Sequence, residues 1–464
     1  MRHVSRLGTF IAALAVSGSA VFSQGQAPRP PRSPYLAAPN GTVAVRAGRM
    51  FDAKAGTMLT NQIILIRGDR IADVGPSVAI PAGTPVIDLS NATVLPGMID
   101  AHVHNAGRGD SVEMKTIVMV QSAERDLQAG FTTTVDMDSR GGFGTVELRD
   151  AINEGLIRGP RMQVSGQSLN QRASAPYPNP GPGFYSGHTE DKNINGPWLA
   201  RAAVRESKLH GVDWIKIYTT QDFVGGRELN EFKPDGSLVA SPSLTFEEVQ
   251  AVVDEAHRMG LKVACHTYGG EGMRSCINAG VDLSMHVTEL YKDDALINTL
   301  IQKKLPIMIT IDDLVGLHNG DLRLLADLGF TGDKAVTRLG MAELTFKKLM
   351  KAGVPLVFGS GAVAGDGTFP HGKQADQFPT MVKWGMTPVQ ALQTTFIGAA
   401  NALNFNWANR VGTLEKNKFA DIIAVTGNPL TDISEMERVK FVMKGGVVVK
   451  NDAAPRAPST GGAQ

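Results

Sequence analysis

Apolar residues in the middle of the chain alternate between short strand-like runs and longer helix-like stretches. Eight runs rich in β-branched residues predict buried strands. The first ends at His102 and His104, and the others cover residues 132–136, 161–165, 214–218, 262–266, 281–286, 306–310 and 355–359. Helical periodicity follows the strands. Residues 245–259 form the clearest case, with a capping box at Thr245 and Glu248 and a stop at Gly260. Eight β/α units predict an α/β fold, a TIM (β/α)8 barrel.

The two ends of the chain have a different pattern, with β-rich runs and hairpin signals at Gly68-Asp69 and Gly445-Gly446. We expect residues 39–95 and 408–451 to form one small β-sandwich domain built from both chain ends. Residues 96–407 then form the barrel. The polar tail, 452–464, is expected to be disordered.

The first residues have the pattern of an export signal. Arg2, His3 and Arg6 precede an apolar stretch that ends near Phe22, and small residues at Gly18, Ala20 and Ser23 offer cleavage sites. We therefore predict a signal peptide at 1–23, with an uncleaved anchor as the alternative, and a Pro-rich linker at 24–38. The mature protein is expected to be secreted or periplasmic, with no membrane attachment.

Composition adds two constraints. The 464-residue chain carries a net charge of +1, so nothing in its charge calls for nucleic acid as a partner. Its two cysteines are Cys265 and Cys276. On a strand Cys265 points away from the neighbouring His266, and we expect it to serve packing.

Polar residues at the ends of the predicted strands suggest a metal site. His102 and His104 are two residues apart and leave the same face of their strand. Lys216 lies between two isoleucines and faces the barrel interior if they face the helices. His266 and His286 end the fifth and sixth strands. A buried lysine is costly unless it is paired or modified, for example carbamylated by carbon dioxide. The alternatives are hydrogen-bonded core histidines and a strand register that turns Lys216 outwards.

Several motifs in order resemble the amidohydrolase superfamily, in its metal-dependent branch of secreted prolidase-like, N-acyl-amino-acid and ochratoxin-type amide hydrolases. The motifs include Leu95-Pro-Gly-Met-Ile-Asp-Ala-His-Val-His, Trp214-Ile-Lys-Ile-Tyr, Gly260-Leu-Lys-Val-Ala-Cys-His, Gly385-Met-Thr-Pro and Asp421-Ile-Ile-Ala-Val. The resemblance implies two divalent metal ions, usually zinc. One is held by His102 and His104, the other by His266 and His286. Carbamylated Lys216 bridges the metals, and a hydroxide between them is the nucleophile.

The chain departs from this pattern at strand eight. The family normally ends that strand in Gly-Thr/Ser-Asp, and the aspartate transfers the proton, but the matching position here is Gly361. A positioned acid/base contributes about 10²–10⁴-fold in rate. Three explanations remain open: another group substitutes, the protein is slow or inactive, or the substrate carries the proton. Candidate substitutes are Asp366, Asp138 and His371.

Substrate contacts are predicted at His188 on the long loop 168–197, at Tyr218 and Tyr268, and at His371. We expect an exported hydrolase that cleaves the amide bond of dipeptides or N-acyl amino acids with a free carboxylate, and that assembles as a homo-oligomer. The alternatives are hydrolysis of a cyclic amide, lactone or imidazolone, and a catalytically impaired binding protein that uses the same pocket.

Overall fold

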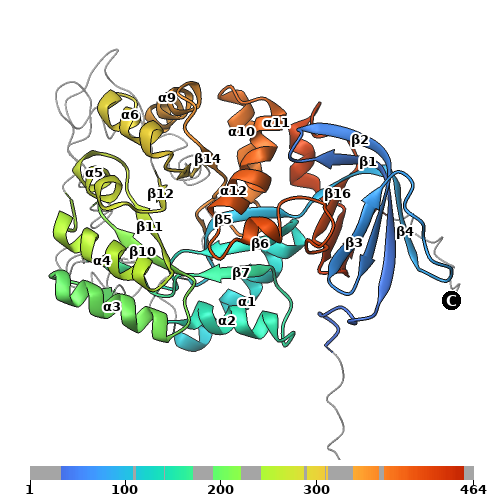
Figure 1. Ribbon diagram of the computed structural model, residues 1–464, viewed down its shortest axis with the longest axis horizontal. Coiled ribbons are helices and arrows are strands. Elements are labelled where there is room, and N and C mark those ends of the chain that lie inside the picture. The colour runs from blue at the N-terminus through green and yellow to red at the C-terminus, as the bar shows by residue number, and fades with distance from the viewer. Residues whose placement is uncertain are drawn as a thin grey trace, which may run out of the picture. The chain divides into compact units, whose positions relative to one another are not determined.

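The computed structural model describes residues 33–107, 111–140, 142–170, 192–220, 242–286, 290–308, 310–311, 338–364 and 370–453. The chain divides into a short unit, Met1–Ser33, and a large compact unit, Pro34–Gln464. Everything below concerns the large unit (Figure 1). The predicted signal peptide and nearly all of the predicted disordered tail lie outside the described residues.

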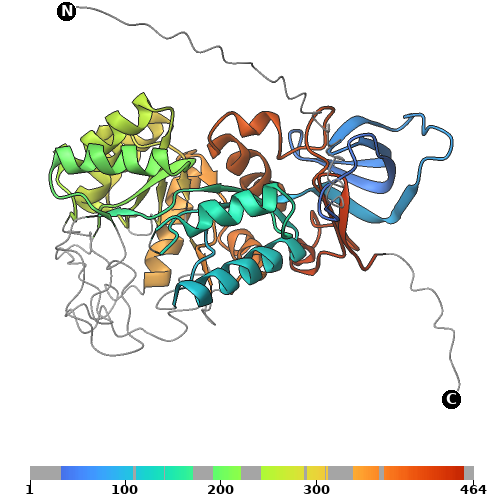
Figure 2. The ribbon, with the colours of Figure 1, turned by 90° about the horizontal axis from the view of Figure 1, so that it is seen from below.

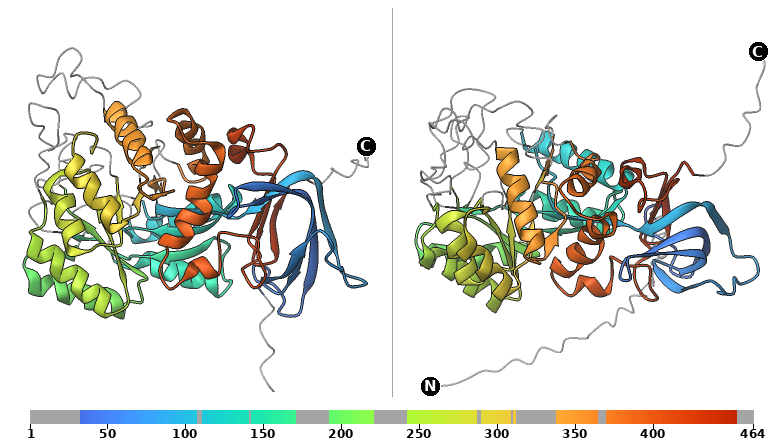
Figure 3. Two further views of the ribbon diagram at one scale, coloured as in Figure 1. Left: turned by 45° about the horizontal axis from the view of Figure 1, so that its top comes forward. Right: turned by 90° about the horizontal axis from the view of Figure 1, so that it is seen from above.

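Both ends of the large unit meet in one seven-stranded sheet. Its order is β18-β17-β16-β4-β1-β2-β3, so carboxyl-terminal strands lie beside amino-terminal ones (Figure 3). The strands are β1 (Thr42–Asp52), β2 (Thr57–Arg67), β3 (Arg70–Gly75), β4 (Val86–Pro96), β16 (Ile422–Val425), β17 (Phe441–Lys444) and β18 (Val447–Asn451). The expected hairpins join β2 to β3 and β17 to β18, and the left-handed backbone of Gly68 and Gly446 suits these turns. Division into two sandwich layers stays a prediction.

Two further sheets are wholly parallel, with orders β15-β5-β6-β7 and β14-β13-β12-β11-β10-β8-β9. Their strands are β5 (Met98–His104), β6 (Phe131–Asp136), β7 (Arg161–Val164), β8 (Leu169–Asn170), β9 (Lys192–Asn193), β10 (Trp214–Tyr218), β11 (Lys262–His266), β12 (Leu283–Met285), β13 (Ile307–Met308), β14 (Leu356–Val357) and β15 (Ala362–Val363). The chain passes between the sheets twice, from β7 to β8 and from β14 to β15. All eight predicted strands are present, and the arrangement is of the TIM-barrel type.

Helices follow the strands, as the periodicity predicts. They are α1 (Val112–Gln128), α2 (Gly144–Asn153), α3 (Pro197–Leu209), α4 (Phe246–Arg258), α5 (Gly270–Ala279), α6 (Asp294–Lys303), α9 (Arg338–Lys351), α10 (Gln377–Lys383), α11 (Pro388–Gln393) and α12 (Ala399–Ala402). Short turns of helix are η3 (Gln374–Asp376), η4 (Thr394–Gly398), η5 (Trp407–Asn409) and η6 (Ile433–Arg438). The capping box of Thr245 and Glu248 forms as expected. Among the described residues, no helix is both long enough and apolar enough to span a bilayer.

Apolar packing fixes which side chains of β10 and β11 face inwards. Ile215 and Ile217 belong to the same buried cluster as Val249 and Val252 of α4. Alternate residues of a strand point to opposite faces, so Lys216 lies on the side away from the helices. Figure 2 shows α3 and α4, in green, along the outer side of these strands. The inward register expected for Lys216 is therefore the one observed.

Cys265 of β11 and Cys276 of α5 are joined by a disulfide bond. The prediction that Cys265 serves packing alone is wrong. Its side chain does point away from His266, into the buried cluster that holds Ile217, and α5 carries Cys276 into the same cluster. The strand pattern does not predict which face of the following helix packs on the strand, so the Cys265–Cys276 bond was not predicted.

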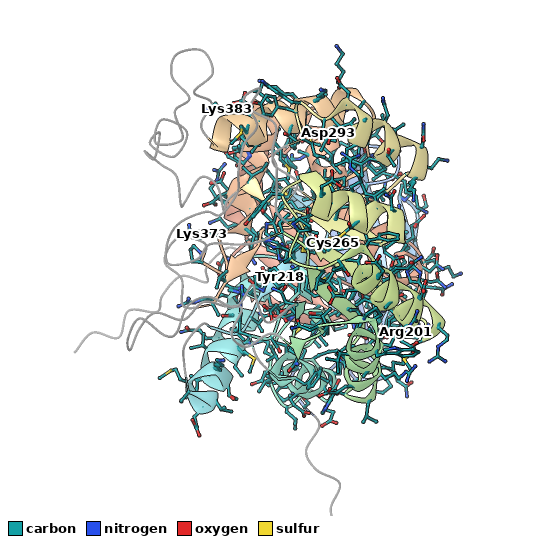
Figure 4. All side chains as sticks on the ribbon, turned by 90° about the vertical axis from the view of Figure 1, so that its left-hand side faces the viewer. Arg201, Tyr218, Cys265, Asp293, Lys373 and Lys383 are labelled. Atoms are coloured by element: carbon teal, nitrogen blue, oxygen red, sulfur yellow. A yellow bond between two sulfur atoms is a disulfide. The ribbon has the colours of Figure 1, made fainter. Side chains whose placement is uncertain are left out.

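A buried carboxylate joins α3 to α4. Glu255 is only 2% exposed, and its Oε1 accepts a hydrogen bond from Arg205 Nε at 2.7 Å and another from Arg258. Arg201, labelled in Figure 4 on the outer helix, lies 3.5 Å from the other carboxylate oxygen. The hydrogen bonds from Arg205 and Arg258 lower the pKa of Glu255 to about 2.

This shift predicts a pH-dependent contribution to stability. Because the pKa of Glu255 is lower in the folded protein, its stabilisation is full above the unfolded pKa of 4.5 and is lost as the pH falls towards 2. Glu255→Gln should therefore lower the free energy of unfolding at pH 7, and the difference from wild type should shrink between pH 5 and pH 3, as chemical denaturation would show. Glu154→Gln, at an exposed carboxylate, is the control. A difference independent of pH would contradict the assignment.

Candidate active site

The carboxyl end of β5 carries two buried histidines side by side. His102 and His104 are 0% and 4% exposed, and their Nε2 atoms lie 3.1 Å apart. Two ring nitrogens turned towards each other at this distance share either a proton or a cation. His102 Nδ1 is buried and has no hydrogen-bond partner among the described residues. The sequence predicted this pair from its spacing, and the structure places both rings together.

The other two predicted histidines join the same group. The ring centroids of His102 and His286 are 4.7 Å apart, and those of His286 and His266 are 4.4 Å apart. His286 has a left-handed backbone, φ 60°, and its Nδ1 lies 2.7 Å from the Thr310 hydroxyl. An uncommon conformation of this kind is maintained by its surroundings and is frequent at functional sites. Four imidazoles from three strands thus form one continuous group, hereafter the histidine cluster.

Lys216 lies on β10, beside the strand that carries His266. Its side chain is fully buried, and its Nζ is 2.8 Å from Met285 Sδ and 4.9 Å from the centre of the Tyr218 ring. Burial, together with the positive charge of Lys216, holds the pKa of His102 well below its usual range. His102 is therefore neutral at neutral pH, which is the form in which imidazole binds a metal.

Below the histidine pair, Asp100 ties β5 to the strand-eight segment. Its carboxylate accepts hydrogen bonds from the Ser360 hydroxyl at 2.6 Å, the Ser360 backbone N–H at 3.0 Å and the His102 backbone N–H at 3.0 Å. Burial raises the pKa of Asp100 to about 7 against the opposite effect of these bonds. Asp100 lies within the motif that contains both histidines, but the motif alone predicted no role for it. Its position two residues before His102, on the same strand face, was the available signal.

Gly361 is the position at which the sequence resemblance predicts an aspartate. Its N–H donates to the His102 carbonyl at 2.8 Å, and its backbone is left-handed, φ 74°. A Cβ atom added here would lie 3.7 Å from His102 Cε1 and 3.3 Å from Thr310 Cγ2. A side chain at position 361 would therefore begin beside the histidine cluster, as the motif resemblance implied.

A buried ion pair lies beside Tyr218. Asp138 Oδ2 is 3.0 Å from Arg140 Nη1 and accepts a hydrogen bond from the Tyr218 hydroxyl at 3.3 Å. The Tyr218 ring in turn packs 4.5 Å from that of His266. Of the three candidate substitutes for the missing aspartate, Asp138 is therefore the one that the structure links to the cluster through a site tyrosine. Arg140 was missed, although its non-glycine backbone at φ 52° marks it in the structure.

Of the remaining predicted site residues, the structure describes some and not others. Tyr268 lies against the cluster, with its ring centroid 5.0 Å from that of His266 and 5.9 Å from that of His286. His188 and Asp366 lie outside the described residues. Tyr218 and Tyr268 thus flank one side of the cluster, from β10 and from the segment after β11.

His371 has contacts other than those expected of a substrate residue. Its Nδ1 lies 2.8 and 2.9 Å from the two carboxylate oxygens of Asp126, and its Nε2 lies 3.1 Å from the His104 carbonyl oxygen. Burial lowers the pKa of His371, but the charge and hydrogen bond of Asp126 outweigh it and raise that pKa overall. The ring is buried behind β5, and both of its nitrogens have partners within the protein. Asp126, on α1, was also missed by sequence analysis.

The donor chemistry of the cluster fits divalent metal ions such as zinc, which favour neutral imidazole ligands. In the ranges that the structure describes, no three side chains of His, Cys, Asp or Glu are placed to hold one ion by themselves. A metal here therefore needs a donor beyond the histidines. Lys216 is one candidate for that donor. It is buried on β10, next to β11, and lies on the strand face that points away from the helices.

Comparison with known proteins supports the resemblance seen in the sequence. Residues 93–449 match the model of the amidohydrolase family. Ochratoxinase from Aspergillus niger is 27% identical over 433 residues, which cover 85% of this chain and 84% of that protein. The crystal structure of a Xaa-Pro dipeptidase with methionine bound in its active site superposes with a TM-score of 0.72 at 30% identity, covering 89% of this chain and all of the other.

A putative prolidase from Bifidobacterium longum is also similar, with a TM-score of 0.70 and 26% identity over 90% of this chain and 96% of the other. The family match covers more than half of the sequence and includes every described residue of the histidine cluster. The chain belongs to the amidohydrolase family.

Proposed function

We propose that this protein is an exported, metal-dependent hydrolase that cleaves the amide bond of dipeptides or N-acyl amino acids. The observation that carries the proposal is the histidine cluster at the carboxyl ends of parallel strands, together with buried Lys216 on β10, the strand beside that of His266. Relatives described as an ochratoxinase and a Xaa-Pro dipeptidase support an amide or peptide substrate.

His102 and His104 would hold one metal ion, and His266 and His286 a second. Lys216, as its carbamate, would supply the donor that the histidines lack. Bound there, the metals would polarise the scissile carbonyl and lower the pKa of the attacking water. Burial, the largest cause of the low pKa of His102 and one that does not depend on the charge of Lys216, keeps its ring available as a ligand at neutral pH.

The surrounding residues would orient the substrate and move its protons. Tyr268 lies against the cluster, and its hydroxyl would suit a substrate carboxylate, whereas the Tyr218 hydroxyl donates to Asp138 and would orient that carboxylate. Asp138, linked to Tyr218 at 3.3 Å, offers a carboxylate near the site in place of the aspartate absent at Gly361. Burial of the cluster excludes bulk water and strengthens each of these contacts.

Replacement of Lys216 tests the metal assignment. Lys216→Ala should reduce turnover of N-acyl amino acids or Xaa-Pro dipeptides by at least about 100-fold, because even indirect metal ligation partners are worth about 10–100-fold. The measurement is kcat/KM with zinc and bicarbonate supplied, together with metal content by mass spectrometry. Added formate or acetate should restore part of the activity by supplying a carboxylate. Exposed Lys208→Ala is the control. Unchanged turnover in Lys216→Ala would place the active site elsewhere.

Gly361 supports a second candidate function, a binding protein that uses the same pocket without turnover. Gly361→Asp separates the two, since its carboxylate would start beside His102. Asp also tolerates the left-handed backbone better than most residues. We expect weak turnover in wild type and a kcat about 10²–10⁴-fold higher in Gly361→Asp than in Gly361→Ala, which adds the Cβ without the carboxylate.

The outcomes of that comparison differ in meaning. Wild type that is active and gains nothing from Gly361→Asp would show that another group, with Asp138 the first to test, already transfers the proton. Wild type that binds N-acyl amino acids in calorimetry without hydrolysing them would favour the binding protein.

Export is a separate part of the proposal, and the Cys265–Cys276 disulfide supports it, because disulfides persist in oxidising compartments. The full chain, expressed in a bacterium with its own leader, should be recovered outside the cytoplasm with a new amino terminus between about residues 21 and 28. Amino-terminal sequencing gives the start, and intact mass before and after reduction gives the disulfide. Retention of Met1 in the cytoplasmic fraction would contradict export.

A further inference from the structure

His371 forms a closed hydrogen-bond network behind the metal-binding end of β5. The ring is held on one side by the Asp126 carboxylate and contacts the His104 carbonyl oxygen on the other. His371 is 4% exposed and Asp126 is fully buried. A network this deep keeps its geometry, because each broken bond leaves a polar group without water.

The rest of the network fixes the orientation of Asp126. Gln374 donates its side-chain N–H to the Asp126 carboxylate, and its Oε1 accepts the Gly372 backbone N–H at 2.7 Å. His371 and Gln374 thus both contact the Asp126 carboxylate of α1 from one short segment, and Gly372 holds the Gln374 side chain in place. The imidazole can rotate only if several of these bonds break together.

The His104 carbonyl is also the point at which the chain beyond strand eight holds β5. It accepts a hydrogen bond from Ala364 N–H at 3.0 Å in addition to the contact with His371 Nε2. In the family pattern, an aspartate side chain at position 361 would link strand eight to the metal. Gly361 supplies only a backbone contact, to His102.

We propose that His371 is a positioning residue for His104. Its hydrogen bond to the His104 carbonyl holds the end of β5 in register with the segment after strand eight, and so sets the position of the His104 ring beside His102. This contact restrains the end of β5 through its backbone. It would replace part of the restraint that an aspartate side chain at position 361 would give through the metal. This inference rests on the proposed function, since it concerns the position of a proposed metal ligand.

Two substitutions separate the two contacts of the ring. The amide of His371→Asn reaches only as far as Nδ1, so it keeps the contact with Asp126 and loses the one with His104. The amide of His371→Gln reaches as far as Nε2 and keeps a donor for the His104 carbonyl. Asp126→Asn is a third variant, of unchanged shape, that leaves His371 able to donate to His104.

The readout is metal binding rather than turnover. Zinc affinity is measured by chelator competition, and cobalt(II) substitution gives a visible absorption spectrum that reports ligand geometry. We expect His371→Asn to weaken zinc binding by about 10–100-fold and to alter the cobalt spectrum, as for other residues that orient a metal ligand. His371→Gln and Asp126→Asn should stay close to wild type. Thermal unfolding of the metal-free proteins records any loss of stability separately.

Each result decides the inference. Wild-type affinity and spectrum in His371→Asn would overturn it. Equal losses of affinity in the Asn and Gln variants, tracking their losses of stability, would reduce His371 to a packing role and overturn it as well. If His371→Gln fails to fold, Asp126→Asn takes its place in this comparison. Wild type that binds neither zinc nor cobalt would instead refute the proposed function itself.

Discussion

The parallel register of β10 and β11 is the constraint on which the site depends. It pairs Tyr218 with His266 and Lys216 with Ala264, while the isoleucines between them pack on the helices. Because side chains alternate along a strand, a slip of one residue would turn Lys216 and His266 into the apolar layer. The cost of burying those groups among isoleucines and valines therefore helps to enforce the register that gathers the histidines.

Gly361 offers this site no side chain, so other contacts hold strand eight against β5. A carboxylate at that position would have tied strand eight to the cluster through a side chain. The described structure ties the same strands through Ser360 to Asp100, through backbone bonds to the carbonyls of His102 and His104, and through His371. Among the described residues, the end of β5 is thus held by backbone atoms and by Asp100, Ser360 and His371 rather than by a side chain at position 361.

Several features of the fold and of the site could be predicted from the sequence, each for a local physical reason. Strand alternation correctly gave the pairing of His102 with His104 and the inward direction of Lys216, since both depend only on a period of two. The capping box at Thr245 was equally local. The sequence could not reveal Asp126 beneath His371, Arg140 beside Asp138, or the Cys265–Cys276 bond. Each of these depends on how a helix or loop is set against a strand, and no pattern within one segment encodes that setting.

The path of β4 has a consequence for the order in which the molecule can fold. This strand runs through Pro96 directly into β5, and its residues Thr93 to Pro96 pair with Ile422 to Val425 of β16. The strand that leads to the histidine pair therefore lacks one neighbour until the last tenth of the chain has been synthesised. Long-range pairing of this kind forms late and slowly. A nascent chain therefore cannot complete the sheet that contains β4 until β16 has been synthesised, whereas the neighbours of β5 itself, β6 and β15, come earlier in the chain.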